Sequence, residues 1–317
     1  MVNNLMHMAK VFILGNGFDL DLGWKTRYSD FASSKYWIED SSYGNDLNFH
    51  LHLDKYIEKW FDLEISLFDY AKAEGKPPVT RERESLINKD KQCFKELTQG
   101  LSDFLRREEK REVNKDSVAA KVLKAILDNG YFTSIYSFNY TNLKSIAGKL
   151  GLSTDFRYEH VHGSIATDSI ILGVEDAVDL YPGYSFLYKT FSPHYESHHI
   201  QYDLLEADEV VFFGHSLGKN DYHYFQSFFR RQCDESLERK QGKRITFFTY
   251  DDASRIGMLE QLREMNDKKT NYLFGLNDME FICTKGGCGN KLKQFLQRMN
   301  LESRSADARR LEGILGR

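Results

Sequence analysis

Two polar side chains stand where predicted strands end, and both could take part in catalysis. Asn139 follows the β-rich run Thr133–Phe138, and its amide could orient a ribose hydroxyl or a water molecule. His162 follows the run Tyr158–Val161, at the point where a strand opens into a loop. Because imidazole titrates near neutral pH, it is suited to act as a general base. We therefore expect Asn139 and His162 to be catalytic; helix capping by the asparagine and a buried structural role for the histidine are the alternatives.

Two loops that contain glycine also follow predicted strands, and both could bind a nucleotide. The loop Gly15–Asp19 would let backbone N–H groups approach a phosphate without obstruction by Cβ, although a tight strand-to-helix turn would use the same residues. It departs from the GxGxxG pattern, since Leu20 holds the third glycine position. The loop Gly214–Asp221 offers small residues, a hydroxyl and a carboxylate. The residues expected to contact a cofactor are Gly15, Asn16, Gly17, Phe18, Asp19, Thr141, Gly163, Gly214, His215, Ser216 and Asp221.

The second of these loops also matches a different kind of site. Gly214–Gly218 reads G-x-S-x-G, the nucleophile-elbow pattern of α/β-hydrolases. In those enzymes the histidine of the triad follows the serine in the chain. His223 is the only histidine after Ser216, and it lies within the predicted following helix. A serine hydrolase is therefore a third hypothesis, and capping of that helix is the simple alternative role for Asp221.

Composition argues against several other classes of protein. The four cysteines form no CxxC pair, so we expect neither a metal site nor a disulfide framework. The net charge of -4 comes without the basic stripe that is typical of a nucleic-acid binder. The chain shows no signal pattern and no apolar run of membrane length. We therefore expect a cytoplasmic protein with neither nucleic-acid nor membrane partners.

The order of β-rich and helix-like segments predicts a parallel sheet with crossover helices, an α/β fold. Ligands bind such sheets beyond the carboxyl ends of the strands, where the loops above would meet. The predicted strands are Lys10–Leu14, Thr133–Phe138, Tyr158–Val161, Ser169–Leu172, Glu209–Phe213 and Lys243–Tyr250.

Helical spacing of apolar residues predicts an insertion at about 33–129, packed on the sheet. We expect it to serve regulation or assembly and not the chemistry. Tyr181–Leu205 is predicted to be a second, aromatic-rich helical stretch. The whole of 1–300 is expected to form one domain, followed by a polar tail at 301–317.

Together these loops resemble the AbiH family of bacterial phage abortive-infection proteins. The opening GNGFDLDLGWKTRYSDF is the most specific part, and SFNYT, HVHGS and FFGHSLGKNDYHYF follow in the expected order. The resemblance covers roughly 10–229 and is expected to include the later strand at Lys243–Tyr250. That family in turn resembles the sirtuin-like NAD-binding fold. The resemblance thus implies a sirtuin-like, Rossmann-type parallel sheet with NAD as its ligand.

The resemblance also implies roles for particular residues. Asn139 lies where sirtuin-like enzymes hold the nicotinamide ribose, and His162 lies where their base does. The cofactor-cradling loops carry Gly15, Gly17, Gly214 and Ser216. Two departures matter: Thr141 stands where the sirtuin pattern has aspartate, and the four-cysteine zinc module of protein deacylases is absent.

We therefore expect a phage-defence effector that binds NAD and hydrolyses it with release of nicotinamide, an NAD glycohydrolase. A nucleotide-binding sensor without catalysis, which signals through the helical insertion, is the alternative. The partners that either role implies are a nucleotide, a second copy of the chain, and a trigger protein from phage or host.

Overall fold

A six-stranded parallel sheet forms the centre of the protein in a computed structural model that describes residues 9–38, 46–57, 62–74, 81–177, 179–234, 236, 242–286 and 288–315. Its strand order is β3-β2-β1-β4-β5-β6, and all neighbours are parallel. This order is typical of dinucleotide-binding sheets, in which the ligand lies where the order reverses, between the first and fourth strands. The strands are β1 (Lys10–Leu14), β2 (Ser134–Ser137), β3 (Glu159–His160), β4 (Glu209–Phe213), β5 (Arg244–Thr249) and β6 (Asp278–Cys283).

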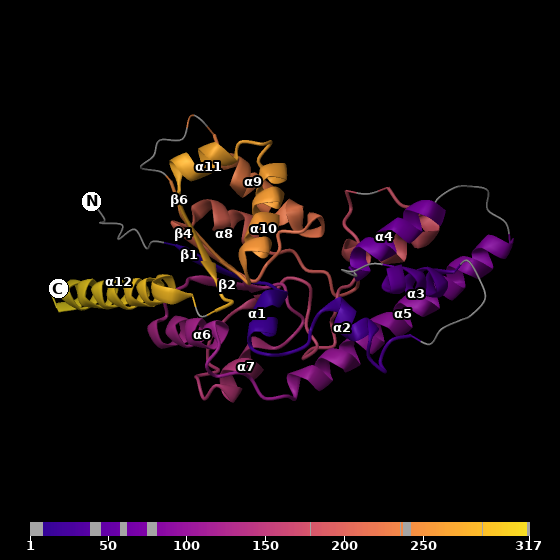
Figure 1. Ribbon diagram of the computed structural model, residues 1–317, viewed down its shortest axis with the longest axis horizontal. Coiled ribbons are helices and arrows are strands. Elements are labelled where there is room, and N and C mark those ends of the chain that lie inside the picture. Colours follow the sequence, from indigo (N-terminus) through magenta and orange to yellow (C-terminus); the bar gives the residue numbers. More distant parts are fainter. Residues whose placement is uncertain are drawn as a thin grey trace.

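Helices cover both faces of the sheet (Figure 1). Successive side chains of a strand point to opposite faces, so Phe12 and Leu14 of β1 pack on one helical layer and Val11 and Ile13 on the other. The first layer contains α1 (Asn16–Asp21), α6 (Val118–Asn129), α7 (Leu143–Lys149) and α12 (Gly289–Leu315). The second contains α8 (Ile200–Glu206), α9 (Tyr222–Arg231), α10 (Asp252–Met265) and α11 (Thr270–Leu276).

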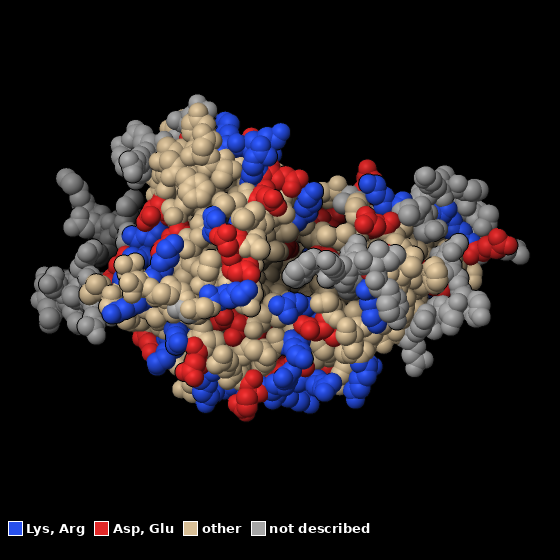
Figure 2. Space-filling model, in the orientation of Figure 1, with Lys and Arg blue, Asp and Glu red and all other residues tan. Residues whose placement is uncertain are grey.

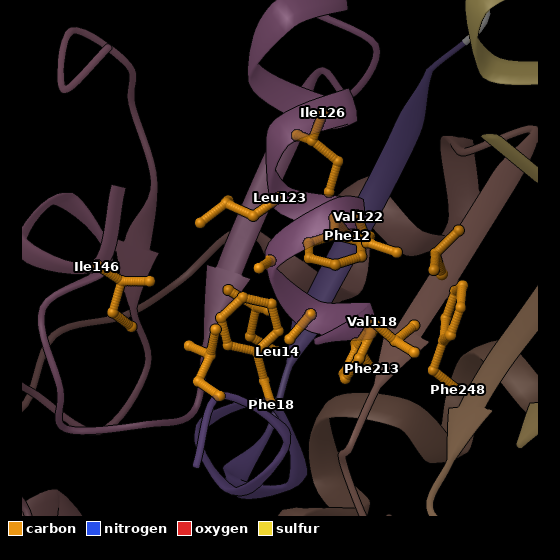
Figure 3. Close-up of a cluster of buried hydrophobic side chains, with 14 of the residues drawn as sticks. Phe12, Leu14, Phe18, Val118, Val122, Leu123, Ile126, Ile146, Phe213 and Phe248 are labelled. Carbon is orange, nitrogen blue, oxygen red and sulfur yellow. The ribbon is translucent and has the colours of Figure 1, made fainter. Parts of the chain in front are cut away.

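Helix α6 is the crossover helix that returns the chain to the sheet before β2. Figure 3 shows it lying over β1, with Val118, Val122 and Ile126 directed at the strand. Ser117 caps its start, because the Ser117 hydroxyl accepts a hydrogen bond from the N–H of Ala120 at 3.0 Å. Gly130 ends it in the left-handed conformation, at φ 54°. The insertion predicted to reach about residue 129 therefore includes a helix that belongs to the sheet layer.

The helices between α1 and α6 form a unit beside the sheet with its own core, here called the helical unit (Figure 1). Its apolar core also takes up Ile170, Leu172 and Tyr184 from a later part of the chain. That later part contains the short 3-10 helices η1 (Pro182–Leu187) and η2 (Lys189–Phe191). The helical unit consists of α2 (Tyr28–Ala32), α3 (Leu47–Ile57), α4 (Leu63–Glu74) and α5 (Arg81–Glu109).

One predicted strand is absent from the structure, and one observed strand was not predicted. The strand predicted at Ser169–Leu172 is wrong: the segment is a loop whose apolar side chains are buried in the core of the helical unit. A short run of apolar residues has the same sequence pattern whether it is buried as a strand of a sheet or as a loop packed on helices. The stretch Tyr181–Leu205 contains η1 and η2 and most of α8. Strand β6 was not predicted, because only one of its residues is fully buried and its sequence is not a continuous apolar run. Helix α12 continues through residues 301–315, where a polar tail was expected.

The turns after β1 and β4 pack against each other backbone to backbone. The N–H of Gly15 donates to the carbonyl of Phe213 and that of Gly17 to the carbonyl of Gly214, both at 2.9 Å. A Cβ on Gly214 would lie 2.4 Å from Gly17 Cα, and Gly214 has a φ of 64°. Both glycines are therefore required by the close approach of two loops at the switch point of the sheet.

We predict that Gly214→Ala destabilises the protein much more than Gly130→Ala. Both glycines have a left-handed φ, which costs a residue with a Cβ about 1–2 kcal/mol. A Cβ on Gly130 meets nothing within 4 Å, whereas one on Gly214 collides with the backbone of Gly17. The collision should add about 1–3 kcal/mol, measured as the difference in free energy of unfolding in urea. Equal losses in the two variants would contradict the packing described here.

Candidate functional site

The predicted loops meet at one edge of the sheet because they follow four neighbouring strands. His162 comes after β3, Asn139 after β2, Gly15 after β1 and Gly214 after β4. In a parallel sheet all these carboxyl ends lie on the same edge. The short 3-10 helix η3 (Lys219–Asp221) then brings Asp221 to the same place.

The described contacts of residues 15–18, in the loop Gly15–Asp19, are with other parts of the protein. Since the N–H groups of Gly15 and Gly17 donate to carbonyls of the β4 turn, both are already engaged within the protein. The side chain of Asn16 makes two hydrogen bonds with Thr26. Asn16 Nδ2 donates to the Thr26 carbonyl, and Asn16 Oδ1 accepts from the Thr26 hydroxyl. Phe18 lies in the core, edge-on to Phe213 with ring centres 5.2 Å apart.

Asn139, Thr141 and Asp19 join the turn after β2 to the helix after β1. Asn139 Nδ2 donates to the carbonyl of Gly15 at 3.1 Å, and the Thr141 hydroxyl donates to Asp19 Oδ2 at 2.7 Å. Asp19 is buried, and burial raises its pKa to about 7, although hydrogen bonds from Thr141 and Asn139 act in the opposite direction. The other carboxylate oxygen, Oδ1, accepts no hydrogen bond from any described residue. Asn139, predicted to be catalytic, and Asp19 and Thr141, predicted to contact a cofactor, thus form a polar cluster whose acid is partly protonated at neutral pH.

His162 forms a hydrogen-bonded pair with Asp221. His162 Nε2 lies 2.9 Å from Asp221 Oδ1, and the imidazole packs edge-on against Phe138. Burial lowers the pKa of His162 and the charge of Lys189 lowers it further, so the ring is neutral at pH 7. Burial alone would raise the pKa of Asp221, but His162, His215 and Lys189 hold it well below its usual range. Nε2–H of a neutral ring therefore donates to an ionised carboxylate, which leaves the lone pair on Nδ1 as the basic site.

His215 binds the other oxygen of the same carboxylate. Its Nδ1 accepts a hydrogen bond from the N–H of Leu217 at 3.0 Å, so the ring carries its proton on Nε2. His215 Nε2 lies 3.4 Å from Asp221 Oδ2. Asp221 was predicted as a ribose ligand or a helix cap; it starts α9, but its side chain makes no capping hydrogen bond. Its carboxylate instead connects two imidazoles.

Sequence reasoning missed two charged residues that complete this group. Lys189 is buried in η2, with Nζ 4.0 Å from Asp221 Oδ1 and 3.2 Å from Glu64 Oε2. Glu64 stands in the first turn of α4, where Asp62 caps the helix by accepting from the N–H groups of Glu64 and Ile65. The helical unit, expected to stand apart from the chemistry, therefore supplies a side chain to the site. A lone lysine among aromatic residues and a glutamate on an amphipathic helix carry no sequence signal of such a contact.

The structure describes the local conformation at Gly163 and Ser216, and the cofactor contacts expected of both stay predictions. A Cβ on Gly163 would lie 1.8 Å from the carbonyl oxygen of Ser169, and its φ is 74°, so the turn after His162 requires glycine. Ser216 is exposed, and no hydrogen bond joins it to a histidine within the described part of the chain. The left-handed residues of its loop are Gly214, at φ 64°, and Leu217, at φ 54°, and not Ser216. These features do not form a nucleophile elbow.

Charged side chains of both signs lie on the described surface that Figure 2 shows. Figure 2 shows lysine and arginine interspersed with aspartate and glutamate over the face where the sheet and the helical unit meet. A cleft of about 440 Å³ lies at the opposite, amino edge of the strands, where Lys10, Glu209 and Arg244 line it. None of the four loops contributes to that cleft. Within the described ranges, no helix has the length and apolar character needed to cross a membrane, and no group of side chains has the arrangement of a metal site.

We predict that Asp19 makes the protein less stable as the pH rises from about 4 to 7. A carboxyl with a raised pKa binds more protons in the folded state than in the unfolded state, so folding loses stability across that window. Asparagine at position 19 stays neutral. Between pH 5 and pH 7.5, the free energy of unfolding of Asp19→Asn in urea should therefore fall by about 2–3 kcal/mol less than that of the wild type. Asp128→Asn, at an exposed position on α6, should keep the wild-type dependence. Identical slopes for wild type and Asp19→Asn would exclude this assignment.

Comparison with known proteins places these loops in a family. No curated protein shows significant similarity to the chain. The family described as "Bacteriophage abortive infection AbiH" matches residues 11–238. The match runs from β1 to beyond α9 and includes all four loops of the site. Because it covers well over half of the 317 residues, the chain belongs to the AbiH family of bacteriophage abortive infection proteins.

Proposed function

We propose that this AbiH protein acts in phage defence by binding NAD at the carboxyl edge of its sheet and hydrolysing it to nicotinamide and ADP-ribose. The observation that carries the proposal is the His162–Asp221 pair, which places a neutral, oriented imidazole at this edge. The strand order supports a dinucleotide as ligand, because ligands of such sheets lie beside the ends of the first and fourth strands. The resemblance of the loops to the sirtuin-like fold supports NAD in particular.

The proposed reaction breaks the bond between the nicotinamide nitrogen and the ribose anomeric carbon. Nicotinamide leaves with the bonding electron pair, and positive charge develops on the ribose. A water molecule then adds to the anomeric carbon, and its proton passes to His162 Nδ1 directly or through a ribose hydroxyl. Asp221 holds the Nε2–H side of the ring and stabilises the imidazolium that forms. The proton is afterwards released to solvent.

Asn139 and the glycine loops would bind the rest of the substrate. Asn139 Nδ2 is used by the carbonyl of Gly15, which leaves its amide oxygen to accept from a ribose hydroxyl or from the attacking water. The N–H groups of Gly15 and Gly17 already donate to carbonyls of the β4 turn, so in this proposal they do not bind the diphosphate. The two glycines instead leave space for the substrate because they have no side chains.

We predict that His162→Ala and Asp221→Asn each lower the rate of nicotinamide release by about 10²–10⁴-fold, because the first removes the general base and the second removes the carboxylate that orients it. The assay incubates the purified full chain with NAD and measures free nicotinamide, with circular dichroism as the check on folding. His194→Ala, which changes an exposed histidine outside the site, is the matched control and should keep the wild-type rate. Wild-type rates in folded His162→Ala would refute the mechanism. NAD binding without nicotinamide release by the wild type would favour the sensor hypothesis.

We predict that Ser216→Ala retains the maximal rate of nicotinamide release within several-fold. In the proposed site its hydroxyl supplies at most one hydrogen bond, worth about 0.5–1.5 kcal/mol. A serine hydrolase would instead lose all activity, since the same hydroxyl would be the covalent nucleophile. A fluorophosphonate probe provides the second measurement. Labelling of wild-type Ser216 together with an inactive Ser216→Ala variant would establish the hydrolase and exclude the function proposed here.

A further inference from the structure

Lys189 stands at the centre of a buried group of carboxylates. Its ammonium lies 3.2 Å from Glu64 Oε2, 3.7 Å from Glu175 Oε1 and 4.0 Å from Asp221 Oδ1. Only 3% of its side chain is exposed. Burial alone would lower its pKa, but Glu64 and Asp221 hold the pKa above its usual range, so the lysine stays charged. A buried ammonium of this kind has a fixed position, because leaving its partners would expose charges to an apolar interior.

Glu64 of α4 contacts two residues outside the helical unit, Lys189 and Asn220. Its Oε2 accepts hydrogen bonds from Lys189 Nζ at 3.2 Å and from Asn220 Nδ2 at 2.9 Å. Asn220 precedes Asp221 in η3, so Glu64 holds both the neighbour of Asp221 and the cation beside it. Burial raises the pKa of Glu64 to about 7, while Lys189 acts in the opposite direction.

We propose that Lys189 and Glu64 are positioning residues that set the orientation and the proton affinity of the His162–Asp221 pair, and that α4 thereby links the helical unit to the site. Lys189 lies beside Asp221 Oδ1, the carboxylate oxygen that also binds His162, and Glu64 binds both Lys189 and Asn220. The part of this inference that concerns catalysis rests on the function proposed above. The linkage itself does not depend on the identity of the substrate.

The charges around His162 determine the direction of the expected effects. Asp221 in η3 and Glu175 favour the protonated ring, whereas Lys189 in η2 disfavours it. His215 shares the carboxylate of Asp221, and Tyr224 of α9 lies edge-on with its ring centre 6.1 Å from that of His162. Because Glu64 partly neutralises Lys189, removing the charge of Glu64 has the opposite effect on His162 from removing that of Lys189.

The test measures the pKa of His162 by NMR titration of ring-labelled histidines in the full chain, with the signal assigned by its loss in His162→Ala. Lys189→Met should raise this pKa by about one unit. Glu64→Gln, which keeps its shape and an oxygen that can accept from Lys189 and Asn220, should lower it by a smaller amount. Lys124→Met and Glu96→Gln, at exposed positions on α6 and α5, are the controls and should leave it unchanged. Shifts of the same sign, or no shift in either site variant, would overturn the proposal.

A second measurement separates this inference from the proposed function. Lys189→Met should lower kcat for nicotinamide release at least tenfold with a smaller change in KM. A wild-type chain that releases no nicotinamide would remove the proposed function, but the opposite pKa shifts would still establish the linkage. If Lys189→Met does not fold, the double variant with Glu64→Gln removes the ion pair as a unit. An unchanged His162 pKa in folded Glu64→Gln then decides against the proposal.

Discussion

The structure of the site depends on one carboxylate, that of Asp221, of whose side chain 18% is exposed. An ionised carboxylate removed from water is costly unless it is paired and hydrogen-bonded. Asp221 meets this requirement with His162 on one oxygen, His215 on the other and Lys189 at 4.0 Å. Each partner comes from a different segment of the chain. The need to satisfy one charge therefore joins the loops after β3 and β4 to η2, and through Lys189 to Glu64 of the helical unit.

A second constraint is the contact of the two glycine turns. Gly17 and Gly214 approach so closely that neither admits a Cβ, and this contact draws the ends of β1 and β4 together at the switch point. His215 follows Gly214 directly, so its imidazole can reach Asp221 only if this turn is tight. The same contact engages the N–H groups of Gly15 and Gly17. Glycine in these loops thus allows two backbone segments to approach each other closely. From the sequence, the same glycines were expected to let the backbone approach a phosphate.

The sequence predicted the edge of the sheet well and the contacts across it poorly. Strands β1 and β4 have their predicted bounds, since a fully buried strand reads as a continuous apolar run between polar turns. The positions of Asn139 and His162 just beyond β2 and β3 were also predicted, because strand ends at a sheet edge are visible as local patterns, and their catalytic roles stay predictions. Lys189 was not, because a buried lysine differs from an exposed one only in partners that are distant in the chain. The loop Ser169–Leu172 was misread for the same reason: its apolar side chains pack on helices encoded far upstream.

The charge of the site fits the reaction proposed for it. Lys189 is surrounded by Glu64, Glu175 and Asp221, so carboxylates exceed ammonium groups around it. Nicotinamide in NAD carries a positive charge, and the same charge moves to the ribose as the bond breaks. Groups placed in advance to stabilise developing charge contribute strongly to catalysis, because they need not reorganise during the reaction. Nicotinamide leaves as a neutral molecule, so an acidic site loses its attraction for the product once the ribose has taken up water. In this proposal, Lys189 helps to keep Asp221 ionised and so preserves the negative charge that acts on the substrate.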